Sequence, residues 1–524
     1  MNSKQFPFKN VFRTSTYVIF GVFLFSLFVY FLNYHYHIIT CLYPQDWNEG
    51  SNILPTYVML QGKNPFDLSN NPQYANIYGI LYPLLVFPLA KIWGPTLLVH
   101  RIVSGFFVFA GCLVIVFVLR KNKLPLLLSF AGGMTFYPFS IFPNTTTDLA
   151  GPHSLGLFLF LMTFFVPYLF NYSKTSLGVS ILIGVLAFYT KLYCVLGIPL
   201  TALYIFLFKS KKTGALYGFI FLIIFIISVY VANSVMYCYF NNIFFVMTSF
   251  NLNGSTAAHA ISELTRFYQL QRPLFFLIGI NFVVQLVLYI KNPPTMPFKD
   301  FFSKTDLFTW REPLLKWDFD INIYGFIITT LFIYFSIGRS MGQFWEYPLQ
   351  LMSPFFILYI FNCLNKHRLT AFLGMPLIII ALFNVASNFS RNFHEFDKNW
   401  EAVDGLVAAS NNIFTNPLII PTLIKYHRPV YDSGHSEYFH LGAERKFLNF
   451  KFPPHPEIEN RNAEYWREVW ALTSQKKFDF LMMYSNYHPF MPNLCILFYR
   501  PIGTIQLGSF DSKWRYDFYI LVPK

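Results

Sequence analysis

Charged side chains are scarce in this sequence. They make up 12% of the 524 residues, whereas an ordinary soluble protein carries about 25%. Hydrophobic residues make up 55% and aromatic residues 21%, and the mean hydropathy is +0.43. This composition excludes a soluble enzyme and a disordered protein, and it predicts a chain that lies largely within a membrane.

Several motifs that would indicate other chemistry are missing as well. The six cysteines are scattered without a C-x-x-C spacing, so neither a zinc site nor a disulfide framework is predicted. There is no tandem repeat of about 20 to 50 residues. No P-loop, G-x-G-x-x-G or G-x-S-x-G motif occurs in a suitable context, so nucleotide and serine-hydrolase chemistry have no support.

The net charge of +14 does not form one basic patch. Residues 388–524 carry 15 basic and 14 acidic side chains, so residues 1–387 carry 24 and 11. The excess therefore belongs to the apolar part of the chain, and we expect no nucleic-acid partner.

Apolar segments long enough for spanning helices, about 20 residues each, dominate residues 1–387. The stretch 175–208 is too long for one helix and carries Lys191 near its middle, so we interpret it as two short spans that meet at the outer face. The first segment follows Lys4, Lys9 and Arg13 and lacks a cleavage site, which is typical of a retained signal anchor. The total is about eleven spans: 13–39, 95–119, 124–142, 152–171, two within 175–208, 213–237, 273–290, 320–336, 347–364 and 369–387.

The positive-inside rule supports this topology, because 17 of those 24 basic residues fall in proposed cytoplasmic loops. An odd number of spans from a cytoplasmic N-terminus places residues 388–524 outside. That segment has ordinary polarity and short β-like runs, so we expect a transmembrane catalytic domain (1–387), with outer loops 40–80, 143–151 and 238–272, followed by an extracytoplasmic α/β domain (388–524).

The first outer loop carries two carboxylates three residues apart, Asp46 and Glu49, directly after the first span. Partial desolvation at the membrane surface raises the proton affinity of a carboxylate and makes it a usable base. In a helix both would face one side. The alternative is a solvated carboxylate that caps the following helix, with Asp46 or Asn48 as the N-cap.

A third carboxylate, Asp148, lies in the short loop before the fourth span, five residues ahead of His153. A helix N-cap explains Asp148 equally simply, because Pro152 marks a helix start. The sequence alone favours that interpretation.

Cations at the outer face are the remaining candidates. Lys191 interrupts a long apolar run, and an ionisable residue there indicates function unless it snorkels to the headgroups. Arg339 lies in a short outer turn, where an ion pair with Glu346 is the alternative. Lys63 and Arg101 also fall at outer positions. Carboxylate bases beside cations that bind phosphate are what group transfer from a phosphorylated donor requires.

The order of these motifs resembles the GT-C superfamily of integral-membrane glycosyltransferases, which use polyprenyl-phosphate sugars and include the protein mannosyltransferase-like families. The similarity covers roughly residues 13–390 and rests on short motifs in a fixed order. These are Asp46-Trp-Asn-Glu49-Gly, Gly62-Lys-Asn-Pro-Phe, Tyr82-Pro-Leu, His100-Arg101, Asp148 before the fourth span, Lys191 after a Tyr-Thr pair, and Tyr347-Pro-Leu-Gln-Leu-Met-Ser-Pro.

The resemblance implies an inverting transfer of a sugar from a polyprenyl phosphate at the outer leaflet. Asp46 matches the catalytic base, and Glu49 or Asp148 would assist it or hold a divalent metal such as Mg or Mn. Lys191 and Arg339 match contacts to the lipid phosphate, with Arg101 and Lys63 as further cations for the donor.

The sequence therefore predicts a polyprenyl-phosphate-dependent glycosyltransferase in a bacterial inner membrane, with membrane lipids around it and a glycan, lipid or protein as acceptor. One alternative is a transporter or flippase of a lipid-linked sugar. Transporters place ionisable groups near the bilayer midplane and show repeated halves, and neither feature is seen here. Another alternative is a non-catalytic protein whose outer domain binds glycans.

Overall fold

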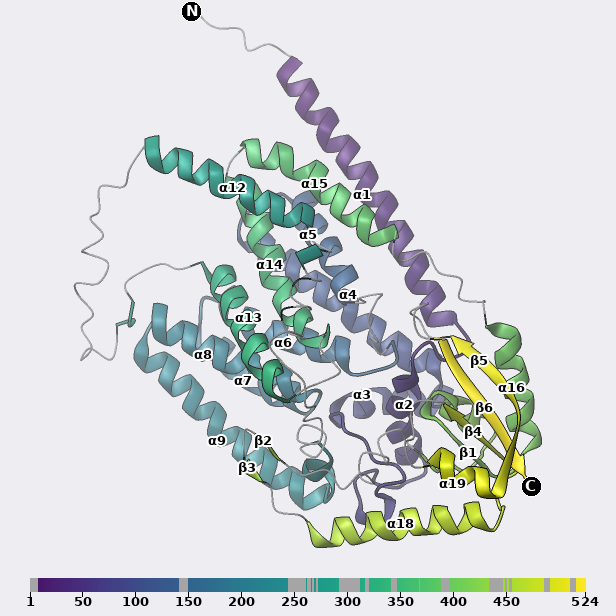
Figure 1. The fold of residues 1–524 in the computed structure, drawn as a ribbon. Helices are drawn as coiled ribbons and strands as arrows, with labels where there is room; N and C mark the ends of the chain where they lie inside the picture. Colours follow the sequence, from purple (N-terminus) through teal and green to yellow (C-terminus); the bar gives the residue numbers. More distant parts are fainter. Residues whose placement is uncertain are drawn as a thin grey trace, which may run out of the picture.

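The structure is a computed structural model in which a helical bundle carries a small α/β unit at one end (Figure 1). It describes residues 8–140, 149–243, 261, 265, 268–269, 272–291, 312–315, 320–340, 346–366, 368–387, 396–432, 446–447, 450–451, 455–484, 491–508 and 515–524.

Each apolar segment expected from the sequence coincides with a helix. The stretch 175–208 is broken at Tyr189–Lys191 into two helices, as expected from the position of Lys191. The helices of the bundle are α1 (Phe8–Thr40), α4 (Leu97–Lys121), α5 (Leu126–Ser140), α6 (His153–Leu169), α7 (Lys174–Phe188), η2 (Leu192–Leu196) with α8 (Gly197–Phe208), α9 (Lys211–Val235), α12 (Arg272–Lys291), α13 (Ile321–Ser340), α14 (Glu346–Lys366) and α15 (Arg368–Ser387).

Three stretches of the described residues are long and apolar enough to cross a bilayer by length and composition: Tyr17–Thr40, Leu97–Lys121 and Lys211–Val235. The other apolar stretches among the described residues are 10–17 residues long, although the helices α12 to α15 themselves run for 20 or 21 residues. The helical positions are therefore confirmed, whereas the count of eleven spans stays a prediction.

Polar caps and left-handed residues set the helix boundaries. Ser173 caps α7 by accepting a hydrogen bond from the backbone N–H of Ser176, and Ser210 caps α9 in the same way. Asn171 and Tyr172, which follow α6, have positive φ values of 52° and 56° and reverse the chain there. Side-chain oxygens satisfy the free N–H groups of a helix start, so these short polar pieces define the turns between apolar helices.

Aromatic side chains fill the centre of the bundle. The ring of Phe355 in α14 packs edge-on against Phe164 in α6, with ring centroids 4.8 Å apart. Gly325 in α13 lies directly on that ring, because a Cβ atom at this position would come within 2.3 Å of it. Large apolar surfaces removed from water or lipid in this way hold α6, α13 and α14 together.

The C-terminal unit is a four-stranded mixed sheet with helices on both faces, as expected for the α/β domain. The strand order is β1-β4-β6-β5; β1 runs parallel to β4, and the other pairs are antiparallel. Its elements are α16 (Asp397–Ala409), β1 (Ile413–Thr415), η4 (Pro417–Ile419), α17 (Ile420–Lys425), α18 (Pro456–Ser474), β4 (Phe480–Tyr484), α19 (Met491–Phe498), β5 (Tyr499–Gly508) and β6 (Arg515–Pro523). The short strands β2 (Lys446–Phe447) and β3 (Phe450–Lys451) pair only with each other and lie beside α9 (Figure 1).

Alternation along β4 explains how the sheet is covered on two sides. Phe480 and Met482 point into a cluster with α16 and α17, while Leu481 and Met483 point into a cluster with α18 and α19. Successive side chains of a strand face opposite sides of a sheet, so both faces are apolar and both require a cover.

The first outer loop supplies part of that cover. It forms α2 (Trp47–Leu60) and η1 (Leu68–Asn70), and α3 (Leu81–Trp93) follows it. Ile53, Leu54 and Val58 of α2 belong to the same apolar cluster as α16 and α17. The helix that begins at the acidic motif is therefore enclosed between the bundle and the C-terminal unit.

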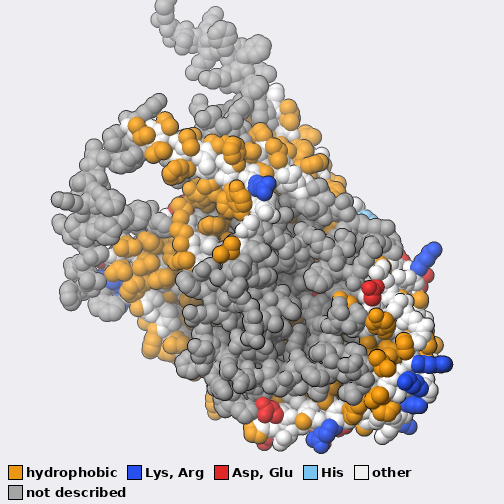
Figure 2. Space-filling model, viewed as in Figure 1, with side chains coloured by type: hydrophobic (Ala, Val, Ile, Leu, Met, Phe, Trp, Pro, Cys, Tyr) orange, Lys and Arg blue, Asp and Glu red, His pale blue; other side chains and the backbone are white. Residues whose placement is uncertain are grey.

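The kinds of side chain at the surface differ between the bundle and the C-terminal unit. On the face drawn in Figure 2, the described side chains of the bundle that are in view are mainly hydrophobic, whereas charged side chains are seen along the edges formed by α16 and α18. Helix α9 exposes most of its apolar residues, since only 6% of its apolar window is buried. An uncovered apolar helix of this kind is typical of contact with lipid.

Candidate active site

The acidic motif forms the start of α2. Asp46 is the N-cap residue, and its Oδ1 atom accepts a hydrogen bond of 2.8 Å from the backbone N–H of Asn48. Glu49, in the first turn, accepts a bond of 2.7 Å from the backbone N–H of Gln45. The arrangement is a variant of the capping box, in which the residue three positions after the cap reaches back. Asp46 is only 2% exposed, so it caps the helix as a buried carboxylate and not as a solvated one.

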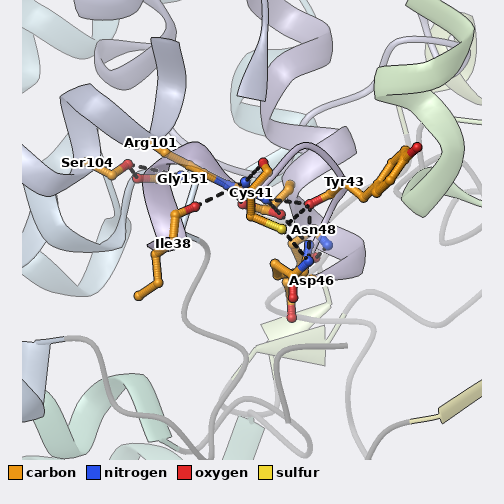
Figure 3. Close-up of polar contacts among 10 residues, drawn as sticks. Ile38, Cys41, Tyr43, Asp46, Asn48, Arg101, Ser104 and Gly151 are labelled. Atoms are coloured by element: carbon orange, nitrogen blue, oxygen red, sulfur yellow. Dashed lines mark hydrogen bonds and ion pairs between the residues drawn. The ribbon is translucent and has the colours of Figure 1, made fainter. Parts of the chain in front are cut away.

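The guanidinium of Arg101 in α4 joins this motif to the end of α1 (Figure 3). Its Nε and one terminal nitrogen donate to the two carboxylate oxygens of Glu49, at 2.8 and 2.7 Å. The remaining N–H groups donate to the backbone carbonyls of Ile38, Cys41 and Tyr43, at 3.2, 2.5 and 2.9 Å. A guanidinium has five N–H donors, so every donor of Arg101 is used.

This ion pair is fully enclosed. Glu49 is 0% and Arg101 1% exposed. Burying two charges is costly unless they are paired and their hydrogen bonds are satisfied, and here both conditions are met. We expected Arg101 to bind the donor phosphate and Glu49 to assist catalysis; in the structure they bind each other, and together they fix the turn that carries Asp46.

The thiol of Cys41 lies beside the same turn, at the end of α1. Burial raises the pKa of the Cys41 thiol, and the nearby Arg101 only partly opposes this effect. The side-chain amide of Gln45 donates to its sulfur at 3.0 Å. Cys41 is therefore a neutral thiol beside the turn between α1 and α2.

The C-terminal unit contacts α2 and the turn before it directly. A Cβ atom at Gly50 would lie 1.9 Å from the backbone oxygen of Pro417 in η4, so only glycine permits this approach. Tyr43 stacks on Trp400 of α16, with ring centroids 5.3 Å apart and planes 6° from parallel. The position of Asp46 consequently depends on contacts from both the bundle and the C-terminal unit.

Lys191 lies in a second polar cluster, at the break between α7 and η2. Its ammonium nitrogen contacts Nδ1 of His153, the first residue of α6, and lies 2.7 Å from Nε2 of the same ring. The rings of Tyr78 and Tyr193 flank it, with centroids 5.0 and 5.3 Å away. Lys191 is 9% exposed, so its side chain does not extend to an exposed surface as snorkelling would require.

Backbone contacts hold the two clusters in one region. Gly79 donates its N–H to the carbonyl of Thr190 at 3.1 Å, and a Cβ atom at Gly79 would collide with the oxygen of Tyr189. This approach places Tyr78 over Lys191. On the other side, Ser104 of α4 exchanges hydrogen bonds of 3.0 and 3.2 Å with Gly151. Ser104 lies one turn from Arg101, and Gly151 lies two residues before His153.

The other predicted site residues are placed differently. Lys63 is exposed and follows the far end of α2, about 20 Å along the helix from Asp46 at 1.5 Å per residue. The backbone of Arg339 belongs to α13, and its side chain lies outside the described residues. Asp148 lies outside them as well. The structure therefore brings Asp46, Glu49 and Arg101 together, with Lys191 in the adjoining cluster.

Among the side chains that the structure describes, no group of three His, Cys, Asp or Glu residues is arranged to hold a metal ion. Asp46 contributes one carboxylate, and the expected second ligand, Asp148, is not described.

Two partnerships in this site were not predicted from the sequence. The pairing of Glu49 with Arg101 joins residues 52 positions apart, and that of Lys191 with His153 joins residues 38 positions apart. The available signal was the isolation of each cation in an apolar run, since a buried charge needs a partner nearby. The identity of the partner required the fold.

Comparison with known proteins identifies the fold. No protein-family model matches the chain, and no curated protein sequence matches it. The crystal structure of ArnT from Cupriavidus metallidurans in the apo state matches 97% of this chain and 98% of its own, with a TM-score of 0.52 and 9% sequence identity. The structure of the same ArnT bound to undecaprenyl phosphate matches 95% and 97%, with a TM-score of 0.49 and 9% identity. At this identity the likeness is one of fold: over nearly its whole length the chain folds like this ArnT.

Proposed function

We propose that this protein is a glycosyltransferase that moves a sugar from a polyprenyl-phosphate donor to a hydroxyl of an outer-face acceptor, with inversion at the sugar carbon. One observation carries the proposal. In an ArnT-like fold, a buried carboxylate, Asp46, is held at the start of the first outer-loop helix by the enclosed pair of Glu49 and Arg101.

Asp46 is the catalytic base in this proposal. It accepts the proton of the acceptor hydroxyl while that oxygen attacks the sugar carbon from the side opposite the phosphate. Rigid placement of such a base contributes substantially to rate, because the reacting atoms then meet in the correct orientation. Glu49 and Arg101 act as positioning residues, since neither has a free direction toward a substrate in the geometry described above.

Lys191 binds the donor phosphate. A donor in which phosphate bridges lipid and sugar is a phosphodiester with one negative charge, and Lys191 supplies one positive charge. The flanking rings of Tyr78 and Tyr193 limit solvent at the ammonium, which strengthens its attraction to an anion. ArnT is bound to undecaprenyl phosphate in one of its crystal structures, and the same lipid class is proposed here.

Residues outside the cluster of Asp46, Glu49, Arg101 and Lys191 also have proposed roles. Asp148 assists Asp46 or shares a divalent Mg or Mn ion with it, while Arg339 contributes to donor binding. Lys63, about 20 Å from Asp46 along α2, is too far away for the expected role at the donor phosphate. The acceptor is a glycan, a lipid or a protein. We place the active site and residues 388–524 on the extracytoplasmic side of a bacterial inner membrane, with the N-terminus in the cytoplasm.

The test is donor turnover by the full-length protein in proteoliposomes. Polyprenyl-phosphate monosaccharides are supplied as a panel with a crude membrane acceptor, and release of free polyprenyl phosphate is followed together with the anomeric configuration of the product. Release with an inverted product supports the proposal. Movement of the intact donor across the bilayer without release, for every sugar in the panel, would instead identify a flippase.

A further inference from the structure

Two buried side-chain amides of α2 have no part in the function proposed so far. Asn48, which lies directly beside Asp46 (Figure 3), is 1% exposed, and Asn52 is 2% exposed. Among the residues that the structure describes, neither side-chain nitrogen has a hydrogen-bond partner. A buried amide without a partner costs free energy, and most buried polar groups are satisfied. Two such amides one helical turn apart therefore indicate a ligand or a bound water at this place.

Two other sides of α2 are covered by the protein itself. Glu49 and Thr56 bond to Arg101 and His100 of α4. Gly50 lies against the backbone of η4, and the neighbouring apolar residues of α2 belong to the cluster with the C-terminal unit. At 3.6 residues per turn, the two amides fall on neither of these sides. They form a stripe on a third side of the helix.

Met59 shows what this third side of α2 faces. It follows Asn52 by seven residues, and residues seven apart lie on the same side of a helix. Met59 packs against an apolar cluster of the outer loop and the end of α9, and Tyr189 and Leu192 pack against the same cluster. Lys191 lies between these two residues in the chain. The amide stripe therefore turns toward the break between α7 and η2 that carries Lys191.

We propose that Asn48 and Asn52 bind hydroxyl oxygens of the donor sugar and thereby determine which sugar is transferred. This inference rests on the proposed function and adds sugar recognition to it. In an inverting transfer the acceptor oxygen and the phosphate lie on opposite sides of the sugar carbon. With Asp46 at the acceptor and Lys191 at the phosphate, the sugar lies between these two residues, which is the side of α2 on which both amides stand.

The chemistry of the two amides defines the class of sugar. A side-chain amide N–H donates hydrogen bonds, and the oxygen of a sugar hydroxyl accepts them. An acidic sugar would bring a second carboxylate beside Asp46, and like charges disfavour each other. A site that hydrogen-bonds a hydroxyl also rejects an analogue that lacks it, because its own polar groups are then left unpaired. The sugar is therefore a neutral hexose that keeps its hydroxyls.

The experiment separates the contribution of the sugar from that of the phosphate. Full-length protein in nanodiscs is titrated by calorimetry with short-chain prenyl phosphates that carry glucose, galactose or mannose, and with the methyl diester of the same prenyl phosphate. All of these ligands carry one negative charge, so the ratio of the dissociation constants of methyl diester and hexoside measures the sugar alone. Wild type should bind at least one hexoside about 100-fold more tightly than the methyl diester, roughly tenfold for each amide.

Leucine variants remove each amide and keep the branching of the side chain. Asn48→Leu and Asn52→Leu should each bind that hexoside about tenfold more weakly and bind the methyl diester as wild type does. Neither should lower the free energy of unfolding, because the amide that it removes has no partner in the described protein. Asn71→Leu is the matched control: its amide donates to Asn462, so it should destabilise the protein and keep the preference for the hexoside. Asn48→Ala and Asn52→Ala repeat the test if a leucine variant does not fold.

Three outcomes would overturn the inference. The first is a wild type that binds every hexoside no better than the methyl diester. The second is a set of variants that lose hexoside and methyl diester equally. The third is a set that is destabilised while its preference for the hexoside stays intact, which would assign the two amides to a bound water. In each case the phosphate ligands still bind wild type, so the proposed function survives. If wild type binds neither the hexosides nor the methyl diester, the polyprenyl-phosphate assignment itself fails, and this inference fails with it.

Discussion

Breaking the pair of Glu49 and Arg101 should lower the free energy of unfolding more than it weakens donor binding. Glu49→Gln leaves the buried guanidinium with three backbone carbonyls and one amide oxygen, but without its counter-charge. Removing one partner of a buried pair costs about 3 to 5 kcal/mol. Because most donors of Arg101 stay satisfied, we expect a loss near the lower end, about 3 kcal/mol, or roughly 100-fold in the unfolding equilibrium.

Arg101→Met should destabilise the protein more than Glu49→Gln does. It leaves the carboxylate of Glu49 unpaired and also removes the guanidinium donors from the carbonyls of Ile38, Cys41 and Tyr43, of which Tyr43 keeps the side-chain amide of Gln45 at 3.3 Å. Each buried carbonyl left without a donor costs about 1 to 3 kcal/mol, so the total exceeds that of Glu49→Gln. The double variant with Glu49→Leu should be more stable than the sum of the single losses predicts, because it contains no unpaired charge, while the carbonyls that lose the guanidinium keep it below wild type.

Unfolding in mixed micelles with increasing SDS, followed by tryptophan fluorescence, measures these differences. Arg120→Met is the matched control, since Arg120 is an exposed residue at the opposite end of the same helix, and it should stay close to wild type. The reasoning is refuted if Glu49→Gln unfolds like wild type and Arg101→Met raises only the KM for the donor. That pattern would make Arg101 a direct phosphate contact.

Three further predictions concern the packing around α2 and the turn that carries Asp46. Gly50→Ala should shift α2 and reduce turnover at least tenfold at saturating donor, because the Cβ atom of the alanine would collide with Pro417. Gly405→Ala in α16 is the control and should leave turnover unchanged, because a Cβ atom there meets open space. Donor turnover of both variants checks this prediction. Asn71→Ala should lower the midpoint of thermal unfolding by several degrees, because the side chains of Asn462 and Asn242 each lose a buried partner. Cys41 should react with iodoacetamide at pH 8 far more slowly in the native protein than after denaturation, because its partial burial raises its thiol pKa and leaves little thiolate. Peptide mapping checks the rate, and equal rates would contradict the raised pKa.

The helical framework could be predicted because its signal is local. Runs of about 20 apolar residues form helices wherever their backbone is removed from water, and even the break at Lys191 follows from one charged residue in an apolar stretch. The short β-like runs expected in residues 388–524 include the strands β4 and β6, and their signal is local as well. The cap at Asp46 was visible as an acidic residue followed three positions later by a glutamate.

The packing of the site could not be predicted because it depends on contacts that are distant in sequence. Nothing in the sequence marks Gly50 as the point at which η4 approaches α2, since its partner is Pro417. Arg101 and Glu49 were each recognised as candidates, but the sequence placed both among substrate-binding or catalytic groups. Only the fold shows that all five donors of Arg101 are used.

The most direct test of the central claim is a single-turnover comparison of wild type with Asp46→Asn, using a polyprenyl-phosphate sugar that wild type consumes. Asparagine caps a helix as well as aspartate does, so this variant keeps the fold of α2 and removes only the base. Asp67→Asn is the matched control in the same outer loop, where Asp67 accepts a bond from Asn64. The account predicts that Asp46→Asn lowers the rate of polyprenyl phosphate release by about 10²- to 10⁴-fold with donor binding retained, and that Asp67→Asn leaves it near wild type. Release by Asp46→Asn within a few-fold of wild type would contradict the account and leave Asp46 as a helix cap alone.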